Sequence, residues 1–239
     1  MIIVIKTNTI IMTSTSTFLL QIHQILCNTY GAPFPYFSNK SPLDQLVSTL
    51  LSHRTKNKLT AQAYQALKKA YPTWEDMLKA SEEEVFSHIQ GVTYAEQKAR
   101  RLQAILTQIK ASNKGNLSLD FLSEYKVKAA RAWLEAFSGI GPKTSAAVLN
   151  FSSLRKPALV VDSHHLRVAE RLGLVAPKTP LHKAAYQLEA LLPQDWGGRE
   201  YYDHHEALMY HGQQCCFYRN PACGQCPVRE LCPSAPSKG

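Results

Sequence analysis

The sequence predicts an all-α protein, and three observations support this fold class. Apolar residues recur at helical spacing along most of the chain between about residues 41 and 214. Several of these stretches begin with serine, threonine or proline, which cap or open helices. Strand signals are nearly absent, because the one extended apolar triplet, Leu159 to Val161, is too short to build a sheet.

The predicted helices with the clearest start signals lie in the first half of the chain. Ser41 and Pro42 open a helix with leucine and valine at i, i+3 and i+4. Thr73 and Ser81 each precede an acidic residue three positions later, which is the capping-box pattern. Further helices are predicted over residues 57–71, 95–111, 127–137, 142–151, 163–172, 181–192 and 200–214.

The helix predicted over 95–111 is amphipathic and basic. Its leucine and isoleucine residues are predicted to face the core. Lys98, Arg100 and Arg101 occupy the remaining positions, so we expect them to lie outside the core.

The net charge favours a polyanionic partner. The chain has 27 Lys and Arg residues against 18 Asp and Glu, a formal charge of +9. The first residues contain only short apolar runs, without a basic segment before them or a cleavage site after them. We therefore predict no export signal and no membrane span, and a cytoplasmic location. Residues 1–17 are predicted to be a disordered leader or an extension before the true start.

A candidate phosphate-binding turn lies between two predicted helices. Gly139 and Gly141 permit a tight turn with outward backbone N–H groups, while Ile140 between them points into the core. Pro142 then begins a helix whose positive end faces the same way. Such a surface accepts a phosphate without reading a base, as a helix-hairpin-helix element does. The alternative is an αα-corner with glycine at a tight contact.

Lys143, in the first turn of that second helix, either touches a phosphate or acts as a nucleophile. Downstream, Asp162 follows an apolar segment and precedes another predicted helix. There it caps the helix, lines a cleft, or does both. An amine attacks a sugar C1′ only when it is neutral, and burial favours the neutral form. A carboxylate stabilises positive charge on the sugar. We therefore favour a catalytic pair of Lys143 and Asp162.

The cysteines near the end of the chain indicate a metal centre with the spacing C-x6-C-x2-C-x5-C. Structural zinc sites usually combine two short pairs, or one with a histidine pair, and only one short pair is present here. A four-thiolate iron–sulfur cluster fits better, with zinc as the alternative. Cys27 and Cys215 fall outside the pattern and are predicted to be buried side chains. The predicted ligands are Cys216, Cys223, Cys226 and Cys232.

Together these motifs resemble the endonuclease III family of helix-hairpin-helix DNA glycosylases. The resemblance extends from about Phe18 to Cys232 and rests on LVSTLLSHRT, KARRLQAI, FSGIGPKTSAAVLNF, VVDSHHLRV, LMYHGQQCC and the cysteine array. It implies two helical domains that flank a DNA-binding cleft. One is a six-helix barrel with the helix-hairpin-helix over residues 35–156, and the other is an iron–sulfur cluster domain of residues 18–34 and 157–239.

The resemblance also implies roles for single residues. Lys143 is similar to the family's Schiff-base lysine, Asp162 to its aspartate, and the four cysteines to the ligands of a [4Fe-4S] cluster. Adenine glycosylases have another residue at the lysine position, so combined glycosylase and AP (β-elimination) lyase activity is implied here. The implied DNA contacts are Gly139, Gly141, Thr144, Arg54, Tyr94, His164 and Arg219.

Two departures from the family pattern bear on the substrate. Arg54 stands where the family commonly has a glutamine that fills the gap left by the flipped base, and residues 91–96 replace a Gly-Leu-Tyr-like loop. The expected substrate is double-stranded DNA with an oxidised pyrimidine or an abasic site, processed in base excision repair by a nucleoid-associated monomer. The alternatives are a glycosylase for mismatched or alkylated bases with weak lyase activity, and a non-catalytic helix-hairpin-helix DNA-binding protein.

Overall fold

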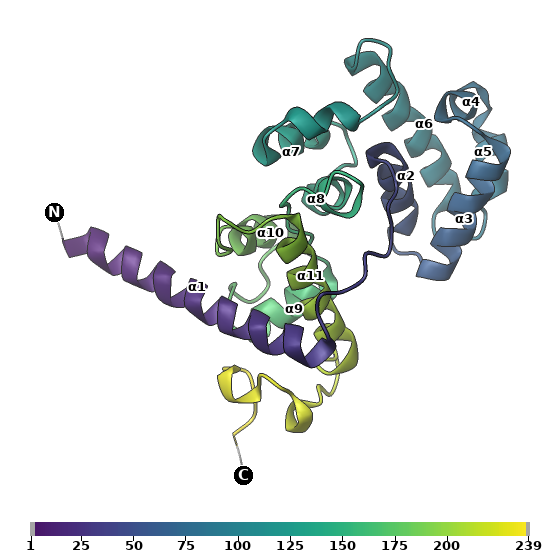
Figure 1. The fold of residues 1–239 in the computed structure, drawn as a ribbon. Helices are drawn as coiled ribbons and strands as arrows, with labels where there is room; N and C mark the ends of the chain where they lie inside the picture. The colour runs from purple at the N-terminus through teal and green to yellow at the C-terminus, as the bar shows by residue number, and fades with distance from the viewer. Residues whose placement is uncertain (1–2, 238–239) are drawn as a thin grey trace. The chain divides into compact units, whose positions relative to one another are not determined.

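The computed structural model describes residues 3–237, with side chains from residue 15 onward. The predicted all-α class is confirmed, because the described residues form eleven α-helices and three short 3-10 helices and contain no strand (Figure 1). Contacts divide the chain into two units. The hairpin unit is Ser38–Leu154, and the cysteine unit joins Met1–Phe37 to Arg155–Gly239. The narrower assignment to a barrel domain and a cluster domain stays a prediction.

Start signals in the sequence explain where the helices of the hairpin unit begin. The Ser41 side chain accepts a hydrogen bond from the Asp44 backbone N–H, and the capping boxes at Thr73 and Ser81 are both formed, as predicted. The α-helices of the unit are α2 (Pro42–Ser52), α3 (Asn57–Ala70), α4 (Trp74–Lys79), α5 (Glu82–Ile89), α6 (Ala95–Ser112), α7 (Val127–Glu135) and α8 (Pro142–Phe151). A 3-10 helix, η1, covers Asp120–Glu124.

Helix α2 lies at the centre of the hairpin unit. It packs against α3, α6 and α8, and its predicted apolar stripe is buried. Nearly all of α8 is buried as well, from Thr144 to Phe151. Because only the first turn of α8 stays partly accessible, Lys143 is held on a fixed helix end at the edge of the core.

Helix α11 has the corresponding place in the cysteine unit. It packs against α1 and α9, and every residue from Tyr201 to Leu208 is buried. Its first residue, Gly198, allows a close backbone approach, because a Cβ there would lie 1.8 Å from the Arg155 carbonyl oxygen. The α-helices of this unit are α1 (Ile3–Tyr30), α9 (Ser163–Arg171), α10 (Leu181–Glu189) and α11 (Gly198–Gln214), and the 3-10 helices are η2 (Cys223–Gln225) and η3 (Arg229–Leu231).

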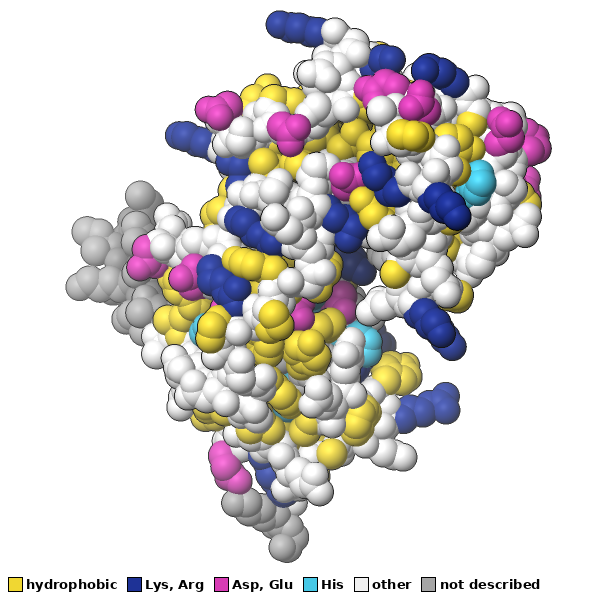
Figure 2. All heavy atoms as spheres, turned by 45° about the vertical axis from the view of Figure 1, so that its right-hand side comes forward, with side chains coloured by type: hydrophobic (Ala, Val, Ile, Leu, Met, Phe, Trp, Pro, Cys, Tyr) yellow, Lys and Arg dark blue, Asp and Glu magenta, His cyan; other side chains and the backbone are white. Residues whose placement is uncertain are grey.

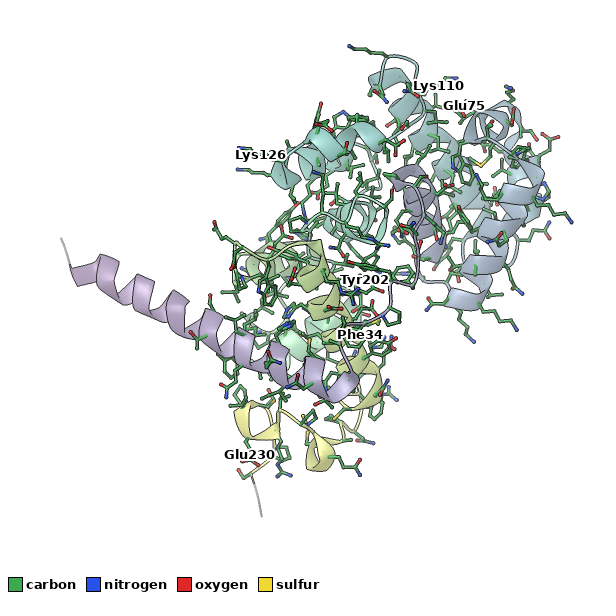
Figure 3. All side chains as sticks on the ribbon, viewed as in Figure 1. Phe34, Glu75, Lys110, Lys126, Tyr202 and Glu230 are labelled. Atoms are coloured by element: carbon green, nitrogen blue, oxygen red, sulfur yellow. The ribbon has the colours of Figure 1, made fainter. Side chains whose placement is uncertain are left out.

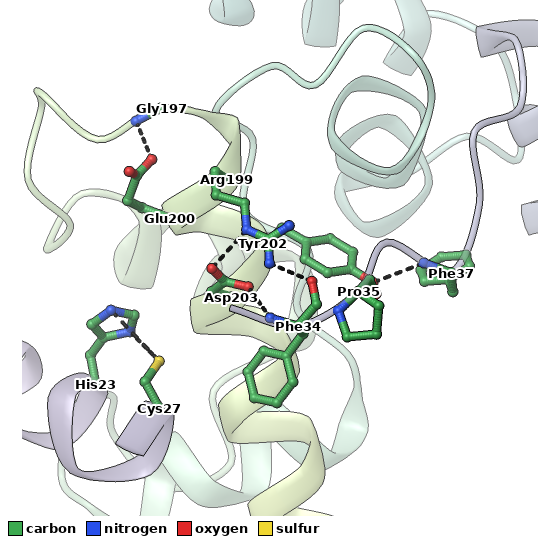
Figure 4. A network of polar contacts seen from close by, with 10 residues as sticks. All are labelled: His23, Cys27, Phe34, Pro35, Phe37, Gly197, Arg199, Glu200, Tyr202 and Asp203. Carbon is green, nitrogen blue, oxygen red and sulfur yellow. Dashed lines mark hydrogen bonds and ion pairs between the residues drawn. The ribbon is translucent and has the colours of Figure 1, made fainter. Parts of the chain in front are cut away.

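Polar contacts fix the segment after α1 onto α11, and Figure 3 shows Phe34 and Tyr202 close together. The Asp203 carboxylate accepts from the Phe34 N–H and from Arg199 Nε, both at 2.9 Å, and Arg199 also donates to the Phe34 carbonyl. The Tyr202 hydroxyl donates to the Pro35 carbonyl at 3.0 Å (Figure 4). Residues near the two ends of the chain are therefore joined into one unit.

Four histidines form a row inside the cysteine unit. His23 Nδ1 lies 3.3 Å from His204 Nδ1, and His165 Nδ1 lies 3.5 Å from His205 Nδ1. The His165 and His204 rings contact each other edge to face, which connects the two pairs. Burial, reinforced by the neighbouring histidines, holds the pKa of His165 and His204 well below the usual value. These rings are therefore neutral packing groups.

Helix α1 includes residues that the sequence analysis assigned to a leader. Residues 1–2 lie outside the described part, and the leader stays a prediction. Among the described residues, no helix has the length and apolar character needed to cross a membrane. Basic and acidic side chains are both spread over the face drawn in Figure 2, so the excess positive charge is not gathered into a single patch there.

Candidate functional site

The hairpin before α8 has the backbone conformation that its glycines predict. Gly139 adopts a φ of 95°, and the Ile140 N–H donates to the Phe137 carbonyl at 3.0 Å to close the turn. Ile140 is buried, as predicted. Gly141 is the N-cap of α8 and offers no side chain to cap it, and Pro142 follows at the first helical position. The remaining N–H groups of this first turn are free to bind an anion.

Lys143 lines a pocket of about 430 Å³ that lies entirely within the hairpin unit. The walls come from α2, from the turn that follows it, from the start of α6 and from the first turn of α8. Three predicted site residues meet here: Lys143, Arg54 and Tyr94. No acidic side chain is among the described residues that line it, which are Leu50, His53, Arg54, Tyr94, Gln97, Lys98, Arg101, Leu102 and Lys143.

Arg54 and Tyr94 hold their places in the pocket through unusual backbone conformations. Both have positive φ, 54° and 58°, and both side chains are exposed. Thr93 connects their two loops, because its N–H donates to Thr55 Oγ1 at 3.1 Å and its hydroxyl donates to the Arg54 carbonyl at 2.8 Å. The two loops therefore form one ordered edge of the pocket.

Lys98 corrects one prediction of the sequence analysis. It was expected to lie outside the core, but it is buried and only 8% exposed. Its Nζ donates to the Leu51 carbonyl at 2.6 Å, the His53 carbonyl at 2.8 Å and Thr55 Oγ1 at 2.9 Å. Burial lowers the pKa of Lys98 to about 8, so it is still mostly charged at neutral pH. Because all three N–H bonds are used, Lys98 holds the turn after α2 in place and is not available as a nucleophile.

His53 is a site residue that the sequence analysis missed. Burial, followed by the charges of Lys143, Lys98 and Arg101, lowers the pKa of His53 to about 4. The ring is therefore neutral at physiological pH. Its Nε2 lies 3.3 Å from the hydroxyl of Thr144, which is buried. Because the side chain is buried, Thr144 could contact DNA only through its backbone N–H. This DNA contact stays a prediction.

Asp162 lies in the cysteine unit at the start of α9. The buried extended segment Ala158 to Val161 leads to it, and its carboxylate caps the helix by accepting from the His165 N–H at 2.8 Å. Buried Glu206 on α11 has its pKa raised to about 7, first by burial and then by the charges of Asp162 and Asp203. Because Lys143 and Asp162 belong to different units, their catalytic pairing stays a prediction.

His164 follows Asp162 on α9 and is held by an arginine. Its Nδ1 lies 3.0 Å from Arg167 Nη2, and the same guanidinium donates to the Gly212 and Cys216 carbonyls. His164 is thus fixed near the start of the cysteine segment. Its predicted contact with DNA is not tested by these interactions.

The predicted cysteine ligands line one cavity in the cysteine unit. Arg171 Nη1 donates to Cys216 Sγ at 3.1 Å, a contact that stabilises a thiolate. The donor set of four sulfur atoms suits iron–sulfur coordination. Cys215 also lines the cavity, but its thiol points to the Ala222 carbonyl at 3.6 Å. The four are Cys216, Cys223, Cys226 and Cys232.

One further donor group lies at the edge of this cavity. Nitrogen or sulfur atoms of His211, Cys215 and Cys226 come within 4.8 Å of one another. The predicted DNA contact Arg219 lies on the loop between Cys216 and Cys223 and is exposed. Arg171 braces this loop by donating to the carbonyls of the two residues before Arg219.

The sequence matches two family models. Residues 47–194 match the HhH-GPD superfamily base excision DNA repair protein model, and residues 219–232 match the iron–sulfur binding domain of endonuclease III. The second match contains Cys223, Cys226 and Cys232, and Cys216 lies just before it.

Curated relatives agree with these matches. The chain is 32% identical to endonuclease III of Thermotoga maritima over 192 residues, which are 80% of this chain and 82% of that protein. It is 29% identical to endonuclease III of Escherichia coli K12 over 196 residues, 80% of this chain and 83% of that one. A protein of Arabidopsis thaliana named as a candidate DNA glycosylase is 30% identical over 193 residues, and this chain spans only 64% of its length.

Solved structures show the same fold at lower identity. A trapped endonuclease III–DNA covalent intermediate superposes with a TM-score of 0.76 at 21% identity. The alignment covers 92% of this chain and 96% of the chain in that structure. A thermostable thymine-DNA glycosylase has a TM-score of 0.72 at 24% identity, with coverage of 93% and 97%.

The fold and the sequence matches define the class as an HhH-GPD DNA glycosylase of base excision repair. More narrowly, the chain belongs to the endonuclease III family and carries that family's iron–sulfur binding domain.

Proposed function

We propose that this protein is a bifunctional enzyme that removes oxidised pyrimidines from double-stranded DNA and cleaves the strand at the abasic site. The observation that carries this proposal is the position of Lys143. Lys143 lines a pocket of about 430 Å³, and none of the described residues that line it is acidic. It lies at a helix start whose N–H groups can bind a backbone phosphate. The likeness to endonuclease III relatives supports the same chemistry.

The proposed reaction begins with attack of the neutral Lys143 amine on C1′ of an extruded nucleotide. The bond from C1′ to the base breaks, and its electron pair leaves with the base as the base takes up a proton. Opening of the sugar breaks the bond from C1′ to the ring oxygen and gives a Schiff base. A proton then leaves C2′, the bond from C3′ to its oxygen breaks, and the 3′ phosphate departs with that electron pair.

Asp162 is the proposed carboxylate for this reaction. It stabilises positive charge that develops on the sugar and moves protons as the base departs. Its position at a helix start, fixed by the His165 N–H, keeps the carboxylate oriented without a salt bridge among the described residues. Capping and catalysis therefore use the same side chain.

The proposed cofactor is a [4Fe-4S] cluster held by the four predicted cysteines. Such a cluster would supply structural order to the loop that carries Arg219, rather than a step in base removal. Arg171 supports this loop from the protein side. Iron and acid-labile sulfide in equimolar amounts in the purified protein would agree with this assignment, whereas zinc without iron would contradict it.

Borohydride trapping on a duplex with an oxidised pyrimidine tests the central proposal. The wild type should form a covalent protein–DNA adduct and Lys143→Ala should form none, because only a Schiff base is reduced to a stable bond. Lys126→Ala is the control, since Lys126 is an exposed lysine of the same unit outside the pocket. An adduct of equal yield in Lys143→Ala would overturn the assignment.

A second candidate function follows from Arg54, which lines the pocket. At this sequence position the family resemblance leads us to expect a glutamine. A side chain that fills the gap left by a flipped base affects which lesions are extruded. The alternative is therefore a glycosylase for mismatched or alkylated bases with weak lyase activity. A panel of duplexes decides between them, because only the leading proposal predicts a preference for oxidised pyrimidines. A protein that binds but nicks no duplex would instead be a non-catalytic DNA-binding protein.

A further inference from the structure

Besides Lys98, whose three N–H bonds are used, three cations of the pocket have no acidic partner among the described residues. Arg54, Arg101 and Lys143 all line it, and none forms an ion pair there. Arg100, the next residue to Arg101 on α6, differs in this respect, because its Nε lies 2.9 Å from Glu82 and its Nη2 lies 3.7 Å from Glu96. The two neighbours on one helix are thus a paired surface arginine and an unpaired pocket arginine.

Arg101 also contacts the hairpin that precedes α8. A Cβ on Gly139 would lie 3.2 Å from Cδ and 3.4 Å from Nε of Arg101, so the arginine side chain occupies the space that the glycine leaves open. Helices α6 and α8 both belong to the hairpin unit (Figure 1). The guanidinium therefore lies beside the phosphate-binding turn and lines the same pocket as Lys143.

The surroundings of Arg101 favour an anion over any other ligand. Lys98 and Lys143 add positive charge to the same pocket, and His53 is neutral and adds none. A guanidinium binds phosphate through two parallel N–H bonds, and such charge-assisted bonds are strong in a partly enclosed site. A single phosphate group of nucleic acid matches this charge and geometry.

We propose that Arg101 binds a phosphate that directly flanks the nucleotide attacked by Lys143. Arg101 is thus a positioning residue that fixes the sugar relative to the amine, alongside the backbone N–H groups of the hairpin. This inference rests on the proposed function, since it takes the pocket to hold a strand of DNA. It adds a residue that the sequence pattern placed on the helix surface.

Binding to a duplex with an uncleavable abasic-site analogue tests the proposal without any catalytic step. Arg101→Gln should lower affinity about tenfold or more, as loss of a charged hydrogen bond does. The slope of log affinity against log salt should fall by about 0.9, the value for one phosphate contact. Arg101→Lys should keep the slope and recover part of the affinity. Arg100→Gln is the matched control and should change neither quantity.

Neutral methylphosphonate linkages, placed one at a time on either side of the analogue, identify the contact. In the wild type one flanking linkage should weaken binding, and in Arg101→Gln that same linkage should cause no further loss. Additive losses at every linkage would overturn the proposal. The trapping of a covalent adduct at Lys143 is a separate measurement. If the wild type forms the adduct and Arg101→Gln binds DNA as tightly as the wild type, the role of Arg101 is rejected and the proposed function stands.

Discussion

The pocket of the hairpin unit and the surroundings of Asp162 in the cysteine unit have opposite electrostatic character. Around Lys143 the charged side chains are basic, and together with burial, which is the larger cause, they lower the pKa of His53. Near Asp162 lies the acidic residue Glu206, whose pKa is raised first by burial and then by the charges of Asp162 and Asp203. The predicted catalytic lysine thus has basic neighbours, whereas the predicted catalytic aspartate has acidic Glu206 near it. Cations around the lysine attract an anionic ligand, and a carboxylate stabilises positive charge that develops during a reaction.

The largest expected effect tests the acidic side of this comparison. Asp162→Asn should slow single-turnover base removal by about 10²- to 10⁴-fold, the range for loss of a group that handles protons and charge. The melting temperature should change little, because asparagine also caps helices. Asp195→Asn, an exposed acidic residue of the same unit, is the control. Unchanged base removal in Asp162→Asn would mean that this residue only caps α9.

The next effect tests the basic side through Lys98. Lys98→Met leaves two carbonyls and a hydroxyl without their donor, and should lower the free energy of unfolding by about 2–3 kcal/mol. The melting temperature should fall by roughly 5–10 °C. Lys68→Met is a suitable control, since Lys68 makes a partly exposed ion pair with Asp44 and a cation–π contact with Trp74, and its loss should cost about 1 kcal/mol. Equal losses in both variants would show that Lys98 does not hold the pocket turn.

The smallest effect concerns the pH dependence of Glu206. Its pKa of about 7 lies above the ordinary 4.5, so between these values the folded state holds a proton that the unfolded state has released. The contribution of Glu206 to stability should therefore fall as pH rises from 4.5 through 7. Glu206→Gln removes this pH-dependent contribution. The melting temperature of the variant minus that of the wild type should therefore be a few degrees higher at pH 8 than at pH 5. A difference between the two proteins that does not change with pH would contradict the raised pKa.

The fold was largely predictable because its signals are local. The capping boxes at Thr73 and Ser81 and the proline at the start of α8 fix helix starts through neighbours within three residues. The shared cavity of the four cysteines likewise follows from their spacing. Cys215 was harder to place, because adjacent cysteines have the same local pattern and only the direction of the side chain separates them.

The pocket was less predictable, since its groups depend on contacts between distant segments. Helical periodicity assigns Lys98 to the surface, and only the carbonyls at the end of α2, more than 40 residues away, explain its burial. The neutral state of His53 depends on burial together with cations from α6 and α8. A buried lysine that stands two residues before a pair of arginines, as in KARR, is the signal to seek in other sequences.

The left-handed backbone at Arg54 and Tyr94 has a consequence for any attempt to make this protein more heat-resistant. A residue with a side chain in that conformation typically costs about 1–3 kcal/mol relative to a relaxed one. Glycine at either position would relieve the strain and remove the exposed side chain at the pocket edge. Selection for thermal tolerance alone would therefore favour the loss of these two residues, including Arg54, which is proposed to affect which lesions are extruded.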